Sequence, residues 1–215
     1  MTRRSVRSLG LALAVVIATA ACTAVPGAPT AASLPTPAPS VASGGTDCPT
    51  AQPGALPAGE TRTVTISTDL GSMTLKIEAD LSPIAAGNFV ALAECGFYDG
   101  VVFHRVVPGF VIQGGDPTGQ GDSGPGYTIK DEPVTAQYGR GVVAMARTLA
   151  PDSVGSQFFI VLDDGARGSL AQANTYQIIG HVTAGMETAD AITSAADAEL
   201  PSNPVAMTKV TVSNP

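Results

Sequence analysis

The alternation of apolar and polar residues first becomes regular about sixty residues into the chain. Apolar and polar side chains alternate over Thr63–Ser67, Asp69-Leu70-Gly71 supplies a turn, and the alternation resumes over Met73–Ile77. A period of two puts every second side chain on one face, which is typical of a half-buried strand. The two runs and their turn therefore predict an antiparallel β-hairpin.

A helical pattern follows the hairpin. Ser82-Pro83 offers an N-cap residue and a proline at the first helical position, and Gly96 is a typical residue after a helix end. Between them, a helix over residues 84–95 would gather five side chains on one face: Ile84, Asn88, Ala91, Leu92 and Cys95. The spacing predicts an amphipathic helix here, and a second helix is expected at 185–195.

The rest of the chain consists of short apolar runs separated by glycine-rich turns. The runs lie at 101–107, 110–114, 141–146, 157–162, 176–182 and 205–212. Together with the hairpin they give eight strands, and no regular alternation of strand and helix is present. This pattern predicts a mainly β fold, a closed eight-stranded antiparallel β-barrel with two flanking helices.

The N-terminus has the pattern of a targeting segment. A basic stretch ending at Arg7 precedes the apolar run Leu9–Ala21, which is too short for a comfortable membrane span but suits a signal-peptide core. The small residues Thr19-Ala20-Ala21 before Cys22 resemble the lipobox of bacterial lipoproteins. We therefore expect a signal peptide at 1–21, lipidation of Cys22, and a protein held outside the cytoplasm on the membrane by this lipid alone. The alternative is a secreted protein cut nearby, with Cys22 lost or left free.

Composition divides the remaining chain into a tether and one domain. Residues 22–59 are rich in Ala, Pro, Ser, Thr and Gly and carry few large apolar side chains, so they are expected to be a disordered tether. The folded domain is predicted at 60–215.

The formal net charge is −7, which argues against binding to nucleic acid. A monomer is expected.

Two further cysteines, Cys48 and Cys95, have to be explained. In an exported protein such a pair favours a disulfide, and the alternative is two buried free thiols. Neither cysteine has the spacing of a zinc site, and the two histidines lie far apart in the sequence. No metal and no cofactor are predicted.

The most specific motif is the run from Phe103-His104-Arg105 to Asp116, in which Pro108-Gly109 joins two short apolar segments. It resembles the signature of the cyclophilin family of peptidyl-prolyl cis-trans isomerases. Further matches to this family follow in order along residues 61–212: Asn88-Phe89, Gly96 to Gly100, Gly119 to Tyr127, Met145-Ala146-Arg147 and Gly155 to Ile160.

The resemblance implies a reaction with a well-defined physical demand. Rotation about an X–Pro bond faces a barrier of about 18–20 kcal/mol, because the C–N bond has double-bond character. No covalent intermediate is needed; the catalyst has to favour the twisted amide over the planar one. The resemblance implies that Arg105 is the catalytic residue, since its permanently charged guanidinium can donate hydrogen bonds around the prolyl amide. Proline-containing unfolded or exported polypeptides would be the substrates.

The resemblance also implies a substrate-binding set. Phe110 and Val111 would form an apolar wall, Phe159 the floor of the proline pocket, and Gln113 a polar contact. Ala146, Arg147 and Gln157 would border the groove for the peptide backbone. Three more residues complete the set. Leu170 lies within residues 166–175, a stretch that departs from the family pattern, and Tyr176 directly follows this stretch. His104 is expected as a packing and hydrogen-bonding residue.

Two other functions compete with this one. Gly121 to Gly126 contains Ser123 in a setting similar to the nucleophile segment of chymotrypsin-like proteases, but His104 lies only nineteen residues upstream and belongs to another motif, so a catalytic triad is rejected. The second alternative is a cyclophilin-like module that binds proline-containing peptides with little turnover. The retained Arg105 and Gln113 favour the enzyme.

Overall fold

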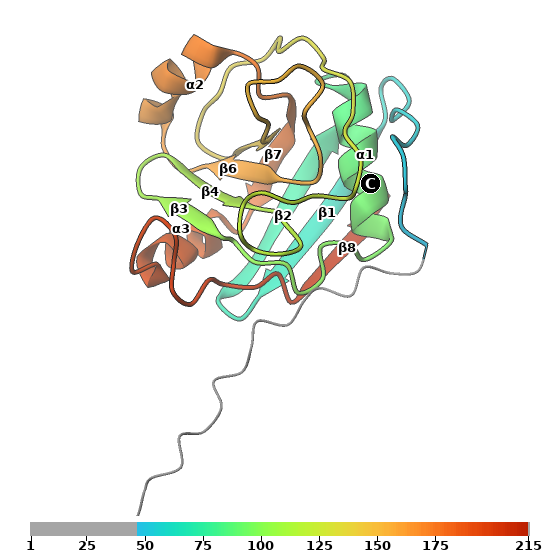
Figure 1. Cartoon of the computed structure of the whole chain (residues 1–215). Helices are drawn as coiled ribbons and strands as arrows, with labels where there is room; N and C mark the ends of the chain where they lie inside the picture. The colour runs from blue at the N-terminus through green and yellow to red at the C-terminus, as the bar shows by residue number, and fades with distance from the viewer. Residues whose placement is uncertain (1–46, 215) are drawn as a thin grey trace, which may run out of the picture. The chain divides into compact units, whose positions relative to one another are not determined.

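The computed structural model describes residues 47–214, and Figure 1 shows their arrangement. Eight strands, three α-helices and one short 3-10 helix follow each other along the chain: β1 (Thr61–Thr68), β2 (Gly71–Glu78), α1 (Pro83–Glu94), β3 (Arg105–Val107), β4 (Val111–Gly114), β5 (Val142–Met145), β6 (Phe158–Val161), η1 (Asp164–Ala166), α2 (Arg167–Ala173), β7 (Ile178–Ala184), α3 (Met186–Ala195) and β8 (Lys209–Ser213). No helix in this part of the chain is long and apolar enough to cross a membrane.

The eight strands form one sheet in the order β3-β4-β6-β5-β7-β2-β1-β8, and all of its ladders are antiparallel. The mainly β fold with eight antiparallel strands is thus confirmed. The predicted closed barrel is not, because no ladder within residues 47–214 joins the end strands β3 and β8, and the sheet is a curled half-barrel. Two segments lie side by side near these end strands: residues 100–106, which lead into β3, and residues 199–207, which precede β8. They share only the isolated bridge Val102–Ala206 and a few backbone hydrogen bonds. Pro201 and Pro204 lie in the second of these segments, and they have no N–H to donate to a regular ladder.

The predicted hairpin is confirmed. β1 and β2 pair from Thr61 opposite Glu78 to Thr68 opposite Gly71. The apolar members of the alternation are fully buried on one face, namely Val64, Ile66, Met73, Leu75 and Ile77. They pack under α1, which lies across β8, β2, β7 and β1.

Helix α1 matches the predicted span within a residue, but its start is capped in a different way. The hydroxyl of Ser82 has no hydrogen-bond partner within the described part of the chain. Instead the carboxylate of Glu132 accepts hydrogen bonds from the amides of Ile84 (2.8 Å) and Ala85 (2.9 Å). A distant side chain therefore satisfies two of the amide groups that a helix N-terminus leaves free. The helix is also buried on more than one face, so the simple amphipathic pattern was wrong.

The second face of α1 is covered by residues 48–56, which the sequence had assigned to a disordered tether. Cys48 forms a disulfide with Cys95, whose Cα lies 5.1 Å away. Leu56 is buried in the core, and its amide donates to the carbonyl of Pro83 (2.9 Å). A Cβ at Gly87 would stand only 2.3 Å from the carbonyl oxygen of Gly54, so the missing side chain permits this contact. The domain boundary at residue 60 was therefore too late. The predicted signal peptide, Cys22 and residues 22–46 of the tether lie outside the described residues.

Helix α3 agrees with the helix expected at 185–195, whereas α2 was not predicted. This seven-residue helix follows the 3-10 turn η1 and ends at Asn174, which has a left-handed backbone (φ 44°). Only Leu170 of α2 is buried, so the helix carries no apolar periodicity that a sequence pattern could reveal. The fold thus has three α-helices where two were predicted.

Candidate active site

Strand pairing brings three of the predicted site residues into one row. Arg105 on β3 is the register partner of Gln113 on β4. Gln113 is in turn opposite Phe159 on β6, and Phe159 is opposite Ala144 on β5. Directly opposed residues of antiparallel strands project to the same face of the sheet. The cation, the amide and the aromatic ring therefore lie side by side, although they are up to 54 positions apart in the sequence.

Arg105 stands at the outer end of this row, and about one third of its side chain is exposed. Its Nε donates a hydrogen bond of 2.7 Å to the carboxylate of Glu199, which precedes β8. Sequence reasoning missed Glu199, because it lies 94 positions away and belongs to no recognisable motif.

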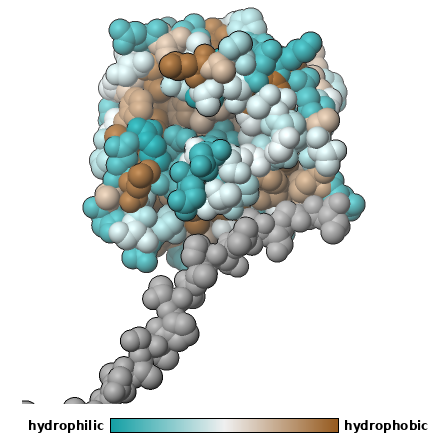
Figure 2. Space-filling view, in the orientation of Figure 1, coloured by the Kyte–Doolittle hydropathy of each residue, from teal (hydrophilic) through white to brown (hydrophobic). Residues whose placement is uncertain are grey.

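The apolar part of the site is a small cluster of buried residues at β4, β5, β6 and α2. Phe159 is its aromatic centre, and its ring meets that of Tyr176 edge to face with centroids 5.3 Å apart. Four more residues of the predicted binding set belong to this cluster or pack against it: Phe110, Val111, Ala146 and Leu170. In Figure 2 apolar residues gather in a recess on the face that carries β6, with polar residues around it. The helix that the sequence did not predict thus places Leu170 in this cluster.

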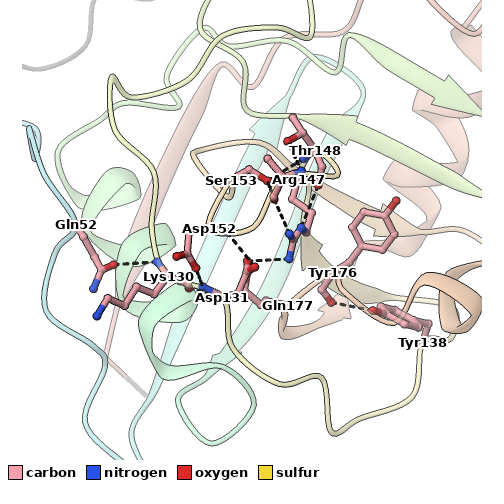
Figure 3. Close-up of polar contacts among 11 residues, drawn as sticks. Gln52, Lys130, Asp131, Tyr138, Arg147, Thr148, Asp152, Ser153, Tyr176 and Gln177 are labelled. Carbon is pink, nitrogen blue, oxygen red and sulfur yellow. Dashed lines mark hydrogen bonds and ion pairs between the residues drawn. The ribbon is translucent and has the colours of Figure 1, made fainter.

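Tyr176 is held in place through its backbone. Its carbonyl oxygen accepts a hydrogen bond of 2.9 Å from the hydroxyl of Tyr138 (Figure 3). Burial raises the pKa of Tyr138 to about 12, so this hydroxyl keeps its proton at neutral pH and remains a donor. Tyr138 itself was not identified from the sequence.

A chain of amides extends from Gln113 away from the apolar cluster. Nε2 of Gln113 donates a hydrogen bond to Oε1 of Gln157 (3.0 Å), and Nε2 of Gln157 donates one to the carbonyl oxygen of Ser123 (3.0 Å). Gln113 and Gln157 border a cavity of about 530 Å³. Its other walls are the loop 121–128, residues 146–148, Ser153, Gly155 and Ser156. The predicted groove residues Ala146, Arg147 and Gln157 all line this cavity.

The loop that forms one wall is organised by Asp116, which is fully buried. Its carboxylate accepts hydrogen bonds from the amide and hydroxyl of Thr118 (2.7 and 2.8 Å) and from the amides of Gly121 (2.5 Å) and Ser123 (3.1 Å). Burial works to raise the pKa of Asp116, but these hydrogen bonds outweigh it and lower the pKa below its ordinary value. The glycine-rich stretch is therefore a fixed loop that borders the cavity.

Arg147 has a different position from a typical peptide-contacting arginine. Only 9% of its side chain is exposed, and its Nη1 forms an ion pair with Asp131 (2.8 Å; Figure 3). Its other nitrogens donate to the carbonyls of Thr148 (3.1 Å) and Ala150 (2.6 Å). Since its donors are used within the protein, the side chain shapes the cavity wall and fixes the loop that follows.

His104 is buried directly before β3. Neither ring nitrogen has a hydrogen-bond partner within residues 47–214. Burial lowers the pKa of this imidazole, although the charge of Asp116 opposes the shift. His104 is thus held neutral near pH 7. Among the described residues no three His, Cys, Asp or Glu side chains lie close enough together to hold a metal ion.

The family model named cyclophilin type peptidyl-prolyl cis-trans isomerase/CLD matches residues 63–212. The chain belongs to this family. It is accordingly a peptidyl-prolyl cis-trans isomerase, and the matched residues contain every strand that builds the row from Arg105 to Phe159.

Individual relatives agree with this assignment. The chain is 47% identical over 120 residues to peptidyl-prolyl cis-trans isomerase B of Bacillus subtilis, and the matched region covers 52% of this chain and 79% of the relative. It is 38% identical over 156 residues to peptidyl-prolyl cis-trans isomerase-like 3 of Dictyostelium discoideum, covering 69% of this chain and 94% of the relative. Other curated relatives are much longer, and this chain spans only 17% to 23% of their length.

Among solved structures, a cyclophilin type peptidyl-prolyl cis-trans isomerase of Cryptosporidium parvum superposes with a TM-score of 0.65 at 32% identity, covering 72% of this chain and 99% of that one. A second structure of that isomerase was solved in the presence of the dipeptide Ala-Pro and gives a TM-score of 0.64.

Proposed function

We propose that this cyclophilin accelerates X–Pro bond rotation in exported polypeptides while they fold. The observation that carries the proposal is the row formed by Arg105, Gln113 and Phe159 on one face of the sheet. A charged donor stands at one end of this row and an apolar, aromatic surface at the other, which matches the two parts of a prolyl peptide: its amide and its ring.

The chemistry follows from this separation. The prolyl ring would lie on Phe159, between the walls made by Phe110, Val111 and Leu170, and would lose contact with water there. The terminal nitrogens of Arg105 would donate to the prolyl nitrogen as it becomes pyramidal in the twisted amide. Because the planar amide offers no comparable lone pair at nitrogen, this hydrogen bond favours the transition state over both ground states. No bond is made or broken.

Gln113 and Gln157 would hold the backbone of the bound peptide. Their side-chain amides are already linked to each other and to the loop at Ser123, so they are ordered before a substrate arrives. Ordered hydrogen-bonding groups need little rearrangement on binding, which favours catalysis by positioning. Ala146 lines the same groove, and Tyr176 and the neutral His104 would support it from the protein side.

The test is the rate of cis-to-trans conversion of a proline tetrapeptide. Removing a donor that acts mainly in the transition state costs roughly 100-fold or more in rate, so Arg105→Ala should lose most of the acceleration. Arg62→Ala is the matched control, because Arg62 also forms an ion pair, with Glu60 at 2.6 Å, but on the far strand β1. Acceleration that survives in Arg105→Ala would contradict the mechanism. A wild-type protein that binds the peptide without accelerating it would be a binding module.

We further propose that the chain works outside the cytoplasm. The proposal rests on the signal-peptide pattern of residues 1–21 and on Cys22 directly after it, and the disulfide between Cys48 and Cys95 suits an oxidising compartment. Lipidated Cys22 would anchor the protein, residues 22–46 would act as a tether, and the isomerase domain would be monomeric. Labelling with a radioactive fatty acid should mark the wild type and not Cys22→Ala. Labelling of neither, with protein in the medium, would show a secreted form.

A further inference from the structure

We propose that Glu199 is a positioning residue for the isomerase reaction, which orients the guanidinium of Arg105. The inference rests on the catalytic role proposed for Arg105. Its starting point is the hydrogen bond of 2.7 Å from Arg105 Nε to Glu199 Oε1. Glu199 lies in the segment between α3 and β8, and it is the one residue of this segment that contacts the row formed by Arg105, Gln113 and Phe159 through its side chain.

The backbone around Glu199 is fastened to the strand that carries Arg105. The carbonyl oxygen of Glu199 accepts a hydrogen bond of 2.8 Å from the amide of Val106, the residue next to Arg105. Further along the same segment, the carbonyl of Val205 accepts from the amide of Phe103 (2.9 Å). The carboxylate and the guanidinium are therefore tied together twice, once through side chains and once through the backbone.

The segment is also fixed internally. The amide of Ser202 donates to the side chain of Asp197 (2.9 Å), which closes a turn around Glu199. Pro201 and Pro204 lie in or just after this turn, and their locked backbone angles restrict the segment further. A carboxylate on a restrained turn can act as a fixed reference point for a mobile side chain.

The geometry leaves the useful donors of Arg105 free. An arginine has five N–H donors, arranged in a rigid planar fork. Glu199 engages Nε, and the two terminal nitrogens form no hydrogen bond with any residue of the part of the chain that the structure describes. Fixing Nε sets the plane of the whole fork. The terminal nitrogens are then directed without being occupied, which is the arrangement that a donor to a transient lone pair requires.

Stability alone explains this pair poorly. About a third of Arg105 and more than half of Glu199 are exposed, and exposed ion pairs contribute little to folding. The pair formed by Arg140 and Asp190 provides a comparison in the same molecule: its N–O distance is also 2.7 Å, and its two partners are similarly exposed. Asp190 lies on α3 and neither lines the cavity nor belongs to the apolar cluster, so Asp190→Ala is a matched control.

The experiment measures the catalysed interconversion rate at saturating peptide by exchange NMR, together with the peptide's Kd. In the full-length protein, Glu199→Ala should lower the rate about three- to tenfold and change Kd by less than about twofold, because an orientation effect acts on the transition state. Glu199→Gln, which retains an oxygen acceptor, should recover at least about half of the rate. Asp190→Ala should behave as wild type.

Salt supplies a readout that a structural role would not move. At about 1 M ionic strength exposed charges are largely screened, so the wild-type rate with an uncharged peptide should fall toward that of Glu199→Ala, while the variant's rate stays constant. The inference is overturned if Glu199→Ala turns over within twofold of wild type while Arg105→Ala is inactive. If Arg105→Ala is fully active, the proposed function fails first, and the two failures are thereby distinguished.

Discussion

Replacing Cys48 and Cys95 together by serine is expected to destabilise the domain without impairing its activity. The disulfide joins residues 47 positions apart. It fastens residues 48–56 across α1, where Leu56 enters the core. The row of the candidate site lies on other elements, with Arg105 on β3, Gln113 on β4 and Phe159 on β6. None of these three residues forms a hydrogen bond with Cys48 or Cys95. Stability and catalysis should therefore respond differently to its removal.

The size of the effect can be worked out from the length of the closed loop. A cross-link lowers the entropy of the unfolded chain by an amount that grows with the logarithm of the loop length, which for a loop of this size amounts to about 4 kcal/mol at 25 °C. Part of this is returned, because residues 48–55 gain freedom in the folded variant as well. We expect the free energy of unfolding to fall by about 2–4 kcal/mol.

Urea denaturation of the oxidised wild type and the double variant measures this loss. With an m-value of about 2 kcal/mol/M, the midpoint should fall by roughly 1–2 M. Each single variant, Cys48→Ser or Cys95→Ser, should lose as much as the double variant, because either change removes the whole bridge. The turnover of a proline tetrapeptide should stay within about twofold of wild type.

A midpoint shift below about 0.3 M would refute this reasoning, because the bridge would then constrain a loop that is already compact in the unfolded state. Single variants that differ clearly from each other would also refute it. In that case the thiols, and not the bond between them, would determine the stability.

Three further predictions concern other elements. Glu132→Ala leaves two amides at the start of α1 without their acceptor and should lower the free energy of unfolding by about 1–2 kcal/mol; an unchanged urea midpoint would show that water replaces the carboxylate fully. Gly87→Ala adds a Cβ that would stand 2.3 Å from the carbonyl oxygen of Gly54, so protease cleavage within residues 48–56 should become faster, and equal cleavage rates would contradict the close packing. Burial lowers the pKa of His104, so on acidification the unfolded state takes up the proton first, and the unfolding free energy of the wild type should fall as the pH drops below about 6.5. The unfolding free energy of His104→Phe should depend less on pH between 7 and 5. A wild type whose unfolding free energy is equally independent of pH would contradict this prediction.

The parts of the fold that the sequence predicts are those that local pattern determines. The hairpin β1–β2 follows from strict alternation, and the bounds of α1 follow from Pro83 at its start and Gly96 after its end. Helix α2 shows the limit of this method. Its one buried residue, Leu170, belongs to the apolar cluster of the site, and Asn174 ends the helix with a left-handed backbone; neither feature leaves a periodic signal in the sequence.

The candidate site divides in the same way. Arg105 and Gln113 belong to one continuous motif, so the resemblance finds them together. Glu199 and Glu132 act on residues 94 and 48 positions away, and a lone glutamate in a loop has the same local sequence appearance whether it contacts solvent or a functional group. Arg147 was found, but its inward direction depends on Asp131, which only the folded chain brings within 2.8 Å.

The pairing of β1 with β8 has a consequence for the order of events during synthesis. These strands pair Thr63 with Ser213 and Ser67 with Lys209, so one edge of the first hairpin has no partner until β8 has been synthesised. Contacts between such distant positions form slowly, and an open strand edge is a site of mispairing in the meantime. The sheet can therefore be completed only once β8 is available, and a chain cut short before β8 should expose the edge of β1 and aggregate.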